Sequence, residues 1–310
     1  MKTALTGIKP TGIPHLGNYL GAILPALKLS ETYNTLYFIA DYHAFTSLRD
    51  PIALKCHVYD VAATWLAAGL DPQKTVFYRQ SSIIETFELA WVLSCLLATG
   101  QLERGHAYKE ALAQGQAPNA GIFNYPVLMA ADILLFDTHI VPVGHDQKQH
   151  LELARDVALR FNHTFGENVL VVPEPLVHDS VLIPGTDGRK MSKSYGNVIP
   201  LFDSAKELKN AVMKIKTGSE PLEAPKDPEN NPVFEIYKAV ASLDQTTKMA
   251  DLLRQGGYGW GHAKLELYDV LEHRLAPLRD RFHELRRNEN KLDNLLQSGA
   301  AQAQRIAQAT

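Results

Sequence analysis

The chain has 310 residues, of which 45% are hydrophobic, and its formal net charge is −3. This length can form one sizeable core and a smaller second unit, and the slightly acidic charge argues against non-specific coating of nucleic acid, so any RNA contact should be a local basic patch. The N-terminus has no basic stretch followed by a long apolar core, and no apolar run reaches membrane-spanning length. A cytoplasmic protein is therefore expected.

Strands and helices are predicted to alternate over the first part of the chain. Apolar runs predict strands at about residues 3–7, 35–41, 74–79, 139–143 and 168–172, with segments of helical periodicity between them. This alternation indicates right-handed crossovers and a doubly wound parallel sheet of the α/β class. Such sheets bind nucleotides at the carboxyl ends of their strands, so polar motifs that follow the strands should meet at one edge.

A glycine-rich turn follows the first predicted strand, from Gly7 to Asn18, and leads into a helical pattern. Glycine lets a nucleotide approach the backbone, and a helix start offers unpaired N–H groups and a positive dipole end to phosphate. His15 lies in this turn, where a lone histidine suits either a surface position or a place beside phosphates.

The two cysteines, Cys56 and Cys95, stand far apart in apolar, helix-like surroundings. Their spacing is not that of metal ligands, so we expect buried free thiols in a reducing compartment. A zinc or iron–sulfur site is not predicted.

Asp132 interrupts an otherwise apolar helix predicted from Val127 to Phe136. An unpaired buried charge is costly, so the fold should provide a partner for this carboxylate. By their helical spacing, one face contains Tyr125, Met129, Asp132 and Phe136. That face would form an apolar slot with one acceptor, complementary to an indole ring and its N–H, although a structural salt bridge or a helix-end charge explains the same residue.

Two further polar motifs follow the fourth and fifth predicted strands. In Gly144-His145-Asp146-Gln147, Asp146 suits either a helix N-cap, with Gln149 completing a capping box, or a contact to a ribose hydroxyl. The run from Lys190 to Ser194 packs two lysines and two hydroxyls into five residues and predicts a cationic clamp for a polyphosphate, with a surface lysine run as the alternative. Glycines on both sides would let this loop close and open.

After the clamp the chain is predicted to be mostly helical. Helices are expected at about 205–216, 232–242, 245–255, 261–287 and 291–309, with a surface loop at 217–231. A basic face for phosphates, or equally an ordinary solvated face, is formed by Lys206, Lys209, Lys214 and Lys216.

Together these motifs resemble the bacterial-type tryptophanyl-tRNA synthetases, which are class I aminoacyl-tRNA synthetases. The segment from His15 to Asn18 looks like the first signature of the class, and residues 190–194 match the second in full; similarity also covers 125–135 and 141–153. The resemblance implies a Rossmann-type catalytic domain at residues 1–185, rejoined by the C-terminal helix at 291–310. It places the clamp loop and a helical anticodon-recognition domain at 186–290.

The resemblance also implies an activity, its partners and a set of site residues. The activity is that of a tryptophan–tRNA ligase, a homodimer that uses L-tryptophan, tRNA(Trp) and ATP with Mg²⁺; no protein-bound metal or organic cofactor is expected. ATP-binding positions are Lys9, Pro10, Thr11, Gly17, Asn18, Gly144, His145, Asp146, Val181, Lys190, Met191, Ser192, Lys193 and Ser194. Catalytic positions are Thr11, His15, Lys190, Ser192 and Lys193. Tryptophan-binding positions are His43, Tyr125, Met129, Asp132, Val141, Val143 and Gln147.

Two departures from the usual pattern, and several alternatives, accompany this interpretation. Lys9 stands where glutamine is common, which adds a cation, and His145 replaces a common glutamate.

A tyrosyl-tRNA synthetase is the near alternative, because a carboxylate such as Asp132 accepts a phenol hydroxyl as readily as an indole N–H. More distant alternatives are a synthetase-like regulator that does not charge tRNA and a general adenylyltransferase.

Overall fold

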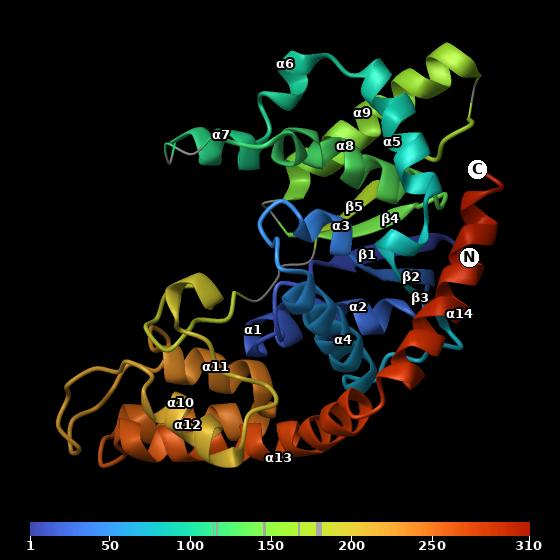
Figure 1. Cartoon of the computed structure of the whole chain (residues 1–310). Coiled ribbons are helices and arrows are strands. Elements are labelled where there is room, and N and C mark those ends of the chain that lie inside the picture. The colour runs from blue at the N-terminus through green and yellow to red at the C-terminus, as the bar shows by residue number, and fades with distance from the viewer. Residues whose placement is uncertain (114, 116, 145–146, 167, 178–181) are drawn as a thin grey trace.

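The computed structural model of the protein describes residues 1–113, 115, 117–144, 147–166, 168–177 and 182–310. Its centre is a five-stranded parallel sheet in the order β3-β2-β1-β4-β5 (Figure 1). The strands are β1 (Thr3–Ile8), β2 (Asn34–Ile39), β3 (Thr75–Arg79), β4 (Ile140–Val143) and β5 (Glu174–Val177). The chain moves from β1 outward to β3 and then returns to the other side of β1, so the strand order reverses between β1 and β4, which is where doubly wound sheets bind ligands.

Helices surround this sheet and form the second unit. Those of the first part are α1 (Leu16–Asn18), α2 (Leu24–Leu29), α3 (Asp41–Ala44), α4 (Pro51–Ala67), α5 (Glu85–Leu96), α6 (Thr99–Leu102), α7 (His106–Ala113), α8 (Ala120–Leu134) and α9 (Lys148–Phe165). A π-helical turn at Tyr19–Ile23 joins α1 to α2. Those of the second part are α10 (Ala205–Met213), α11 (Pro232–Val240), α12 (Leu243–Gln255), α13 (Trp260–Arg286) and α14 (Glu289–Ala307).

Two apolar clusters cover the two faces of the sheet. One joins Tyr37, Ile39 and Phe77 to α4 and continues into α10–α13. The other joins Leu36 and Phe38 to α5, α8 and α9. The predicted α/β class, parallel sheet and mostly helical second part are therefore confirmed.

The helix α14 runs along β3, the outer strand of the sheet (Figure 1). Gly299 makes this contact possible, because a Cβ atom at that position would lie 1.9 Å from the carbonyl oxygen of Phe77. Near the ends of the helix, Asp293 accepts a hydrogen bond from Tyr59, and Gln304 donates one to Glu85. An edge strand that would otherwise present unpaired backbone groups is thereby covered.

Two predictions about local structure were wrong. The fifth strand lies at Glu174–Val177 and not at about 168–172. Leu170 is buried, but the side chain of Asn162 accepts its N–H and donates to its carbonyl, both at 2.8 Å, in place of a neighbouring strand. The thiols of Cys56 and Cys95 are free but exposed, because both lie on outward sides of helices that are apolar almost all round.

In the described part of the chain, no helix is both long enough and apolar enough to cross a bilayer.

Candidate active site

The loop after β1 positions His15 at the start of α1. Its Nδ1 accepts the N–H of Asn18 at 3.3 Å, and the Asn18 side chain accepts the N–H of His15 at 3.1 Å. Burial, aided by the charge of Lys193, lowers the pKa of His15 to about 4. The imidazole is therefore neutral at pH 7, and since Nδ1 is an acceptor the proton is on Nε2, ready to donate a hydrogen bond.

The clamp loop rests directly on this first signature. Met191 is buried, and its sulfur accepts the N–H of Gly17 at 3.3 Å. The ammonium of Lys193 donates to the carbonyl of Thr11 at 3.2 Å. Partial desolvation of that ammonium lowers the pKa of Lys193. The structure thus brings together two motifs that are more than 170 residues apart in the sequence.

Asn197 holds the clamp loop in shape and was not predicted from the sequence. Its side chain, 2% exposed, accepts the N–H of Ser192 at 2.8 Å and donates to Asp187 at 2.7 Å and to the carbonyl of Lys190 at 3.1 Å. The bond from Asn197 to Asp187, together with the bonds from Arg189, lowers the pKa of Asp187 to about 2. Its place directly after Gly196, at the end of the clamp loop, is the sequence signal that could have pointed to the role of Asn197.

A cavity of about 260 Å³ opens beside the clamp at the reversal point of the sheet. Six of the predicted ATP and catalytic residues line it, namely His15, Gly17, Asn18, Gly144, Lys190 and Met191. The hydroxyls of Ser192 and Ser194 lie 2.8 Å apart on the exposed side of the loop. Pro10, Thr11, Ser192, Lys193 and Ser194 are outside its lining. The predicted positions His145, Asp146 and Val181 lie outside the described residues, and α9 has Gln147 as its N-cap with no side-chain capping bond.

Asp132 has the partners that its burial requires. The carboxylate is 3% exposed and accepts from Nε2 of His43 at 2.8 Å and from Nε2 of Gln80, which is 2.8 Å from both oxygens. Burial raises the pKa of Asp132, and the bonds from His43 and Gln80 oppose that rise. Gln80 also accepts the backbone N–H of Tyr42 and of His43. This glutamine was missed, although a polar residue just after β3 is a signal of the same kind as the other motifs.

The predicted amino-acid residues form a connected group around this carboxylate. The ring of Tyr125 lies 4.3 Å from that of His43 and 5.4 Å from that of His150, whose Nδ1 lies 3.0 Å from Oε1 of Gln147. Lys9 reaches the same group, with its ammonium 5.4 Å from the Tyr125 ring and 3.4 Å from the Thr46 hydroxyl, and burial lowers its pKa.

The remaining residues predicted to bind tryptophan lie partly in the apolar core and partly at the nucleotide cavity. Met129 packs on the second apolar cluster and Val141 belongs to it, whereas Val143 also lines the nucleotide cavity. The apolar slot predicted beside Asp132 stays a prediction. A cavity of about 330 Å³ between α3, α5 and α8 includes His43 in its described lining but neither Asp132 nor Tyr125. The carboxylate is therefore enclosed, because β3, α3 and α8 converge on it.

The geometry suits a reaction in which the carboxylate of an amino acid attacks a phosphate group of a nucleotide. Lys190 and the neutral imidazole of His15 line one cavity, and Lys193 extends from the same clamp loop to the carbonyl of Thr11. Asp132 offers an enclosed acceptor close to the rings of His43 and Tyr125. Comparison with known proteins identifies the family. Residues 1–276 match the family described as tRNA synthetases class I (W and Y).

Two curated relatives extend this match over the whole chain. The tryptophan–tRNA ligase of Fusobacterium nucleatum is 46% identical over 99% of this chain and 94% of that protein. The tryptophan–tRNA ligase of Pseudomonas putida is 48% identical over 98% of this chain and 70% of that protein. The chain belongs to the tryptophanyl-tRNA synthetases. 

Solved tryptophanyl-tRNA synthetases have the same fold. The enzyme of Campylobacter jejuni, crystallised with ADP and tryptophan, superposes with a TM-score of 0.93 at 44% identity, covering 99% of this chain and 96% of that one. A tyrosyl-tRNA synthetase of Archaeoglobus fulgidus superposes with a TM-score of 0.69 at 20% identity, which shows a shared fold only. The comparisons therefore support the tryptophan branch over the tyrosine branch.

Proposed function

We propose that this chain activates tryptophan with ATP·Mg²⁺, forms tryptophanyl-adenylate and pyrophosphate, and then transfers tryptophan to the 3′ end of tRNA(Trp). The observation that carries this proposal is the docking of the clamp on the first signature, through Met191 to Gly17 and Lys193 to Thr11. It holds the clamp loop beside the cavity at the strand reversal, which Lys190 and His15 line.

At the phosphates the chain acts by positioning and by charge. The tryptophan carboxylate attacks the α-phosphorus and pyrophosphate leaves, so negative charge has to be stabilised on the transferring phosphoryl and on the leaving group. Lys190 and Lys193 would hold the β- and γ-phosphates, and ATP would draw the Lys193 ammonium away from Thr11. His15, kept neutral by burial, would donate from Nε2 without adding charge. Ser192, Ser194 and Thr11 would supply further neutral donors.

In the amino-acid site Asp132 would accept the indole N–H. A carboxylate that already accepts from His43 and Gln80 still has lone pairs for a third donor. The ring of Tyr125 and the side chain of Met129 would contact the indole. Because Asp132 is enclosed in this structure, tryptophan binding would require these side chains to open and then close on the ring.

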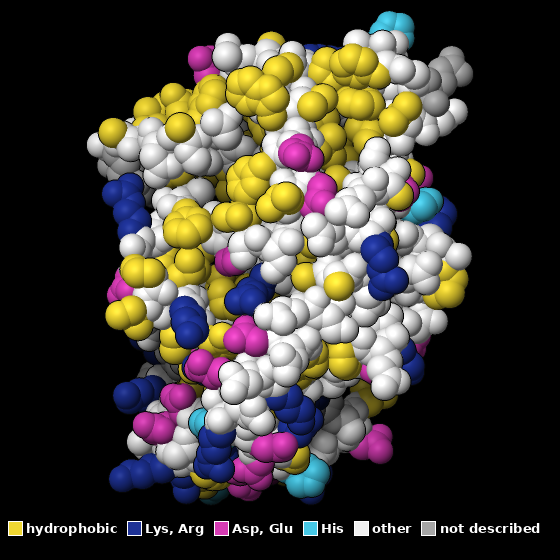
Figure 2. Space-filling view, turned by 45° about the vertical axis from the view of Figure 1, so that its right-hand side comes forward, with side chains coloured by type: hydrophobic (Ala, Val, Ile, Leu, Met, Phe, Trp, Pro, Cys, Tyr) yellow, Lys and Arg dark blue, Asp and Glu magenta, His cyan; other side chains and the backbone are white. Residues whose placement is uncertain are grey.

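The second unit and the surface suggest the larger partners. Residues 186–290 would recognise the anticodon, with α10 offering exposed lysines for phosphates, and residues 1–185 with α14 would form the catalytic domain. A homodimer is supported by an apolar patch of Ile84, Phe87, Trp91 and Val92 at α5, where Trp91 is 72% exposed. Hydrophobic side chains gather over the upper half of the face drawn in Figure 2, the half that contains α5 in Figure 1. A cytoplasmic location would follow from this role.

Amino-acid-dependent ATP–pyrophosphate exchange, measured with each standard amino acid and no tRNA, tests the proposal. We expect exchange with tryptophan alone, followed by charging of tRNA(Trp). Lys193→Gln should lower the exchange rate about 10²- to 10³-fold, as the loss of one donor to a transition-state oxyanion does. Lys248→Gln, at an exposed lysine of α12, is the matched control and should change little. Exchange with tyrosine would overturn the role of Asp132, and exchange with no amino acid would indicate a regulator.

A further inference from the structure

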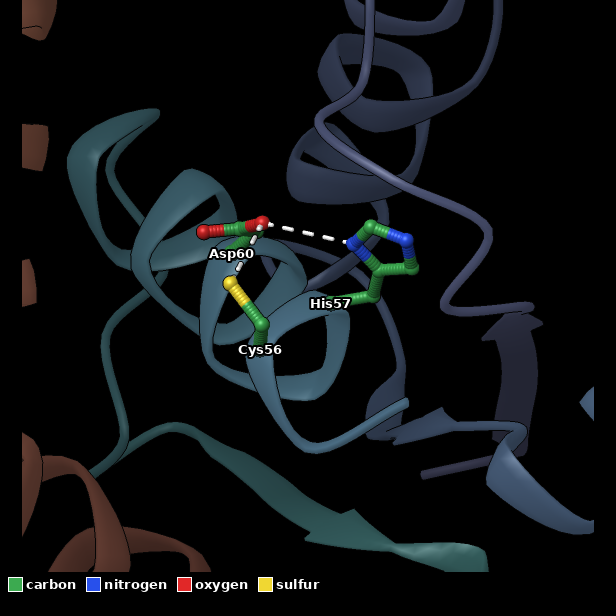
Figure 3. A group of neighbouring side chains, drawn as sticks. All are labelled: Cys56, His57 and Asp60. Atoms are coloured by element: carbon green, nitrogen blue, oxygen red, sulfur yellow. Dashed lines mark hydrogen bonds and ion pairs between the residues drawn. The ribbon is translucent and has the colours of Figure 1, made fainter. Parts of the chain in front are cut away.

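Three side chains that commonly bind metals meet on α4, outside the residues assigned above. Cys56, His57 and Asp60 come from two consecutive turns, and their ligand atoms all lie within 4.8 Å of one another. Figure 3 shows one oxygen of the Asp60 carboxylate facing both the thiol of Cys56 and a ring nitrogen of His57. The set combines one sulfur, one nitrogen and one oxygen ligand.

One oxygen of Asp60 lies close to both of the other ligand atoms. Oδ2 of Asp60 accepts a hydrogen bond from Sγ of Cys56 at 3.8 Å, a length that only a sulfur donor reaches, and lies 3.6 Å from Nδ1 of His57, which is too far for an ordinary N–H···O bond. An N–H···O bond is normally about 2.7–3.2 Å long, and Nδ1 of His57 is buried without a hydrogen-bond partner among the described residues. Ligand atoms bound to one tetrahedral zinc ion, at bond lengths of about 2.0–2.3 Å, lie roughly 3.4–3.6 Å apart. The two spacings to Oδ2 of Asp60 are therefore close to those of ligands that share an ion, and all three ligand atoms lie within 4.8 Å of one another.

Arg286 supplies the outer contacts that such a site needs. Its Nε donates to Oδ1 of Asp60 at 2.8 Å, and its Nη2 lies 3.6 Å from Sγ of Cys56. The guanidinium therefore engages the carboxylate oxygen that faces away from His57 and leaves Oδ2 to the cluster. A donor of this kind orients a ligating carboxylate. Because Arg286 ends α13, a bound ion would also strengthen the link between α4 and the helical unit.

We propose that Cys56, His57 and Asp60 form a binding site for a divalent transition metal of the zinc class, with a fourth position open to water. Thiolate and imidazole ligands select zinc-class ions over Mg²⁺, which prefers oxygen ligands only. The site is thus different in kind from the Mg²⁺ that ATP carries. It adjoins the first signature, since the His57 ring is 3.8 Å from the place of a Cβ atom on Gly12. The spacing of the two cysteines could not predict it, because only Cys56 takes part.

Co²⁺ titration of tag-free, reduced protein tests this site by a spectroscopic signal that is independent of activity. Wild type should show a saturable thiolate-to-cobalt charge-transfer absorption that Zn²⁺ displaces. The absorption should disappear in Cys56→Ser, and in His57→Gln the affinity should fall by at least about tenfold. Cys95→Ser, which removes the other exposed thiol, is the matched control and should keep the absorption unchanged.

The same samples give a second readout through stability. A ligand that binds only the folded state raises its thermal midpoint, so Zn²⁺ should raise the midpoint of wild type and of Cys95→Ser but not of Cys56→Ser. His57→Gln keeps the test decisive if the serine variant does not fold. The proposal is overturned if folded wild type gives no thiolate absorption, if Cys56→Ser retains it, or if Cys95→Ser loses it.

Discussion

Replacing Asp132 by asparagine separates a substrate contact from a structural role. The change keeps the shape of the side chain and removes its charge. A hydrogen bond to a charged group contributes about 1.5–3 kcal/mol, so the KM for tryptophan in pyrophosphate exchange should rise roughly 10- to 150-fold. The KM for ATP should change little, because Asp132 lies outside the nucleotide cavity lining. The variant should also unfold more easily by about 1–3 kcal/mol, since His43 and Gln80 lose a buried charged acceptor.

Asp41 provides a matched control for this change. It is a second buried carboxylate, 7% exposed, and it accepts the N–H and the hydroxyl of Ser81. Burial raises the pKa of Asp41, as it does that of Asp132. Asp41→Asn should therefore lower stability by a similar amount in denaturant titration while leaving the KM for tryptophan nearly unchanged.

A substrate isostere completes a double-mutant cycle. In 3-benzothienylalanine, sulfur replaces the indole N–H and leaves the ring shape almost the same. Wild type should prefer tryptophan over this isostere by about the factor that Asp132→Asn costs, and the variant should lose most of that preference. If the variant penalises both substrates equally, Asp132 does not accept the indole N–H and its role is to order His43 and Gln80.

Three further predictions follow from single residues. Lys9→Gln should retain activation but change the KM for ATP about 2- to 5-fold, as expected for loss of a partly shielded charge, and an unchanged KM would exclude a phosphate role. Gly299→Ala should destabilise the protein by about 1–3 kcal/mol in denaturant titration, because the new methyl group meets the backbone of Phe77. Gly261→Ala is the control and should not destabilise it, since its new methyl group would project into open space. Equal stabilities of the two variants would disprove the close packing at Gly299. The pKa of His15 is lowered to about 4, against about 6.5 when unfolded, so the unfolded state takes up a proton first as the pH falls. Relative to pH 7, the protein should lose at most about 3 kcal/mol of stability between about pH 6.5 and 4, and less where solvent screens the imidazole. His15→Gln should flatten that part of the stability–pH curve, and an unaltered slope would contradict the burial argument.

The sheet and its ligand edge could be predicted because their signals are local. Four strands lie within one or two residues of the predicted positions, since each is a short apolar run that ends at a turn. The fifth could not be placed, because Leu170 sits in an equally apolar run whose backbone is satisfied by the Asn162 side chain. Glu174–Val177 contains a proline and an acid, so it resembles a loop. Only the tertiary contact decides between the two segments.

The site shows the same division between local pattern and tertiary contact. The signatures at His15 and Lys193 could be found because each is a compact motif. Gln80 and Asn197 were missed, since the position of a lone amide after a strand or a glycine is a weaker signal than a compact motif, and its role depends on what it faces after folding. The exposure of Cys56 was also hidden, because α4 has few polar residues to mark its outer side.

The cover that α14 gives to β3 has a consequence for the order of folding. The strand is complete at Arg79, but the helix that lies along it ends at Ala307. Translation proceeds from the N-terminus, so a growing chain holds β1, β2 and β3 for most of its synthesis without that cover. An uncovered edge strand can pair with another chain. The nascent protein is therefore most prone to aggregate just before its last helix emerges, and loss of α14 would be more harmful to yield than its distance from the cavity suggests.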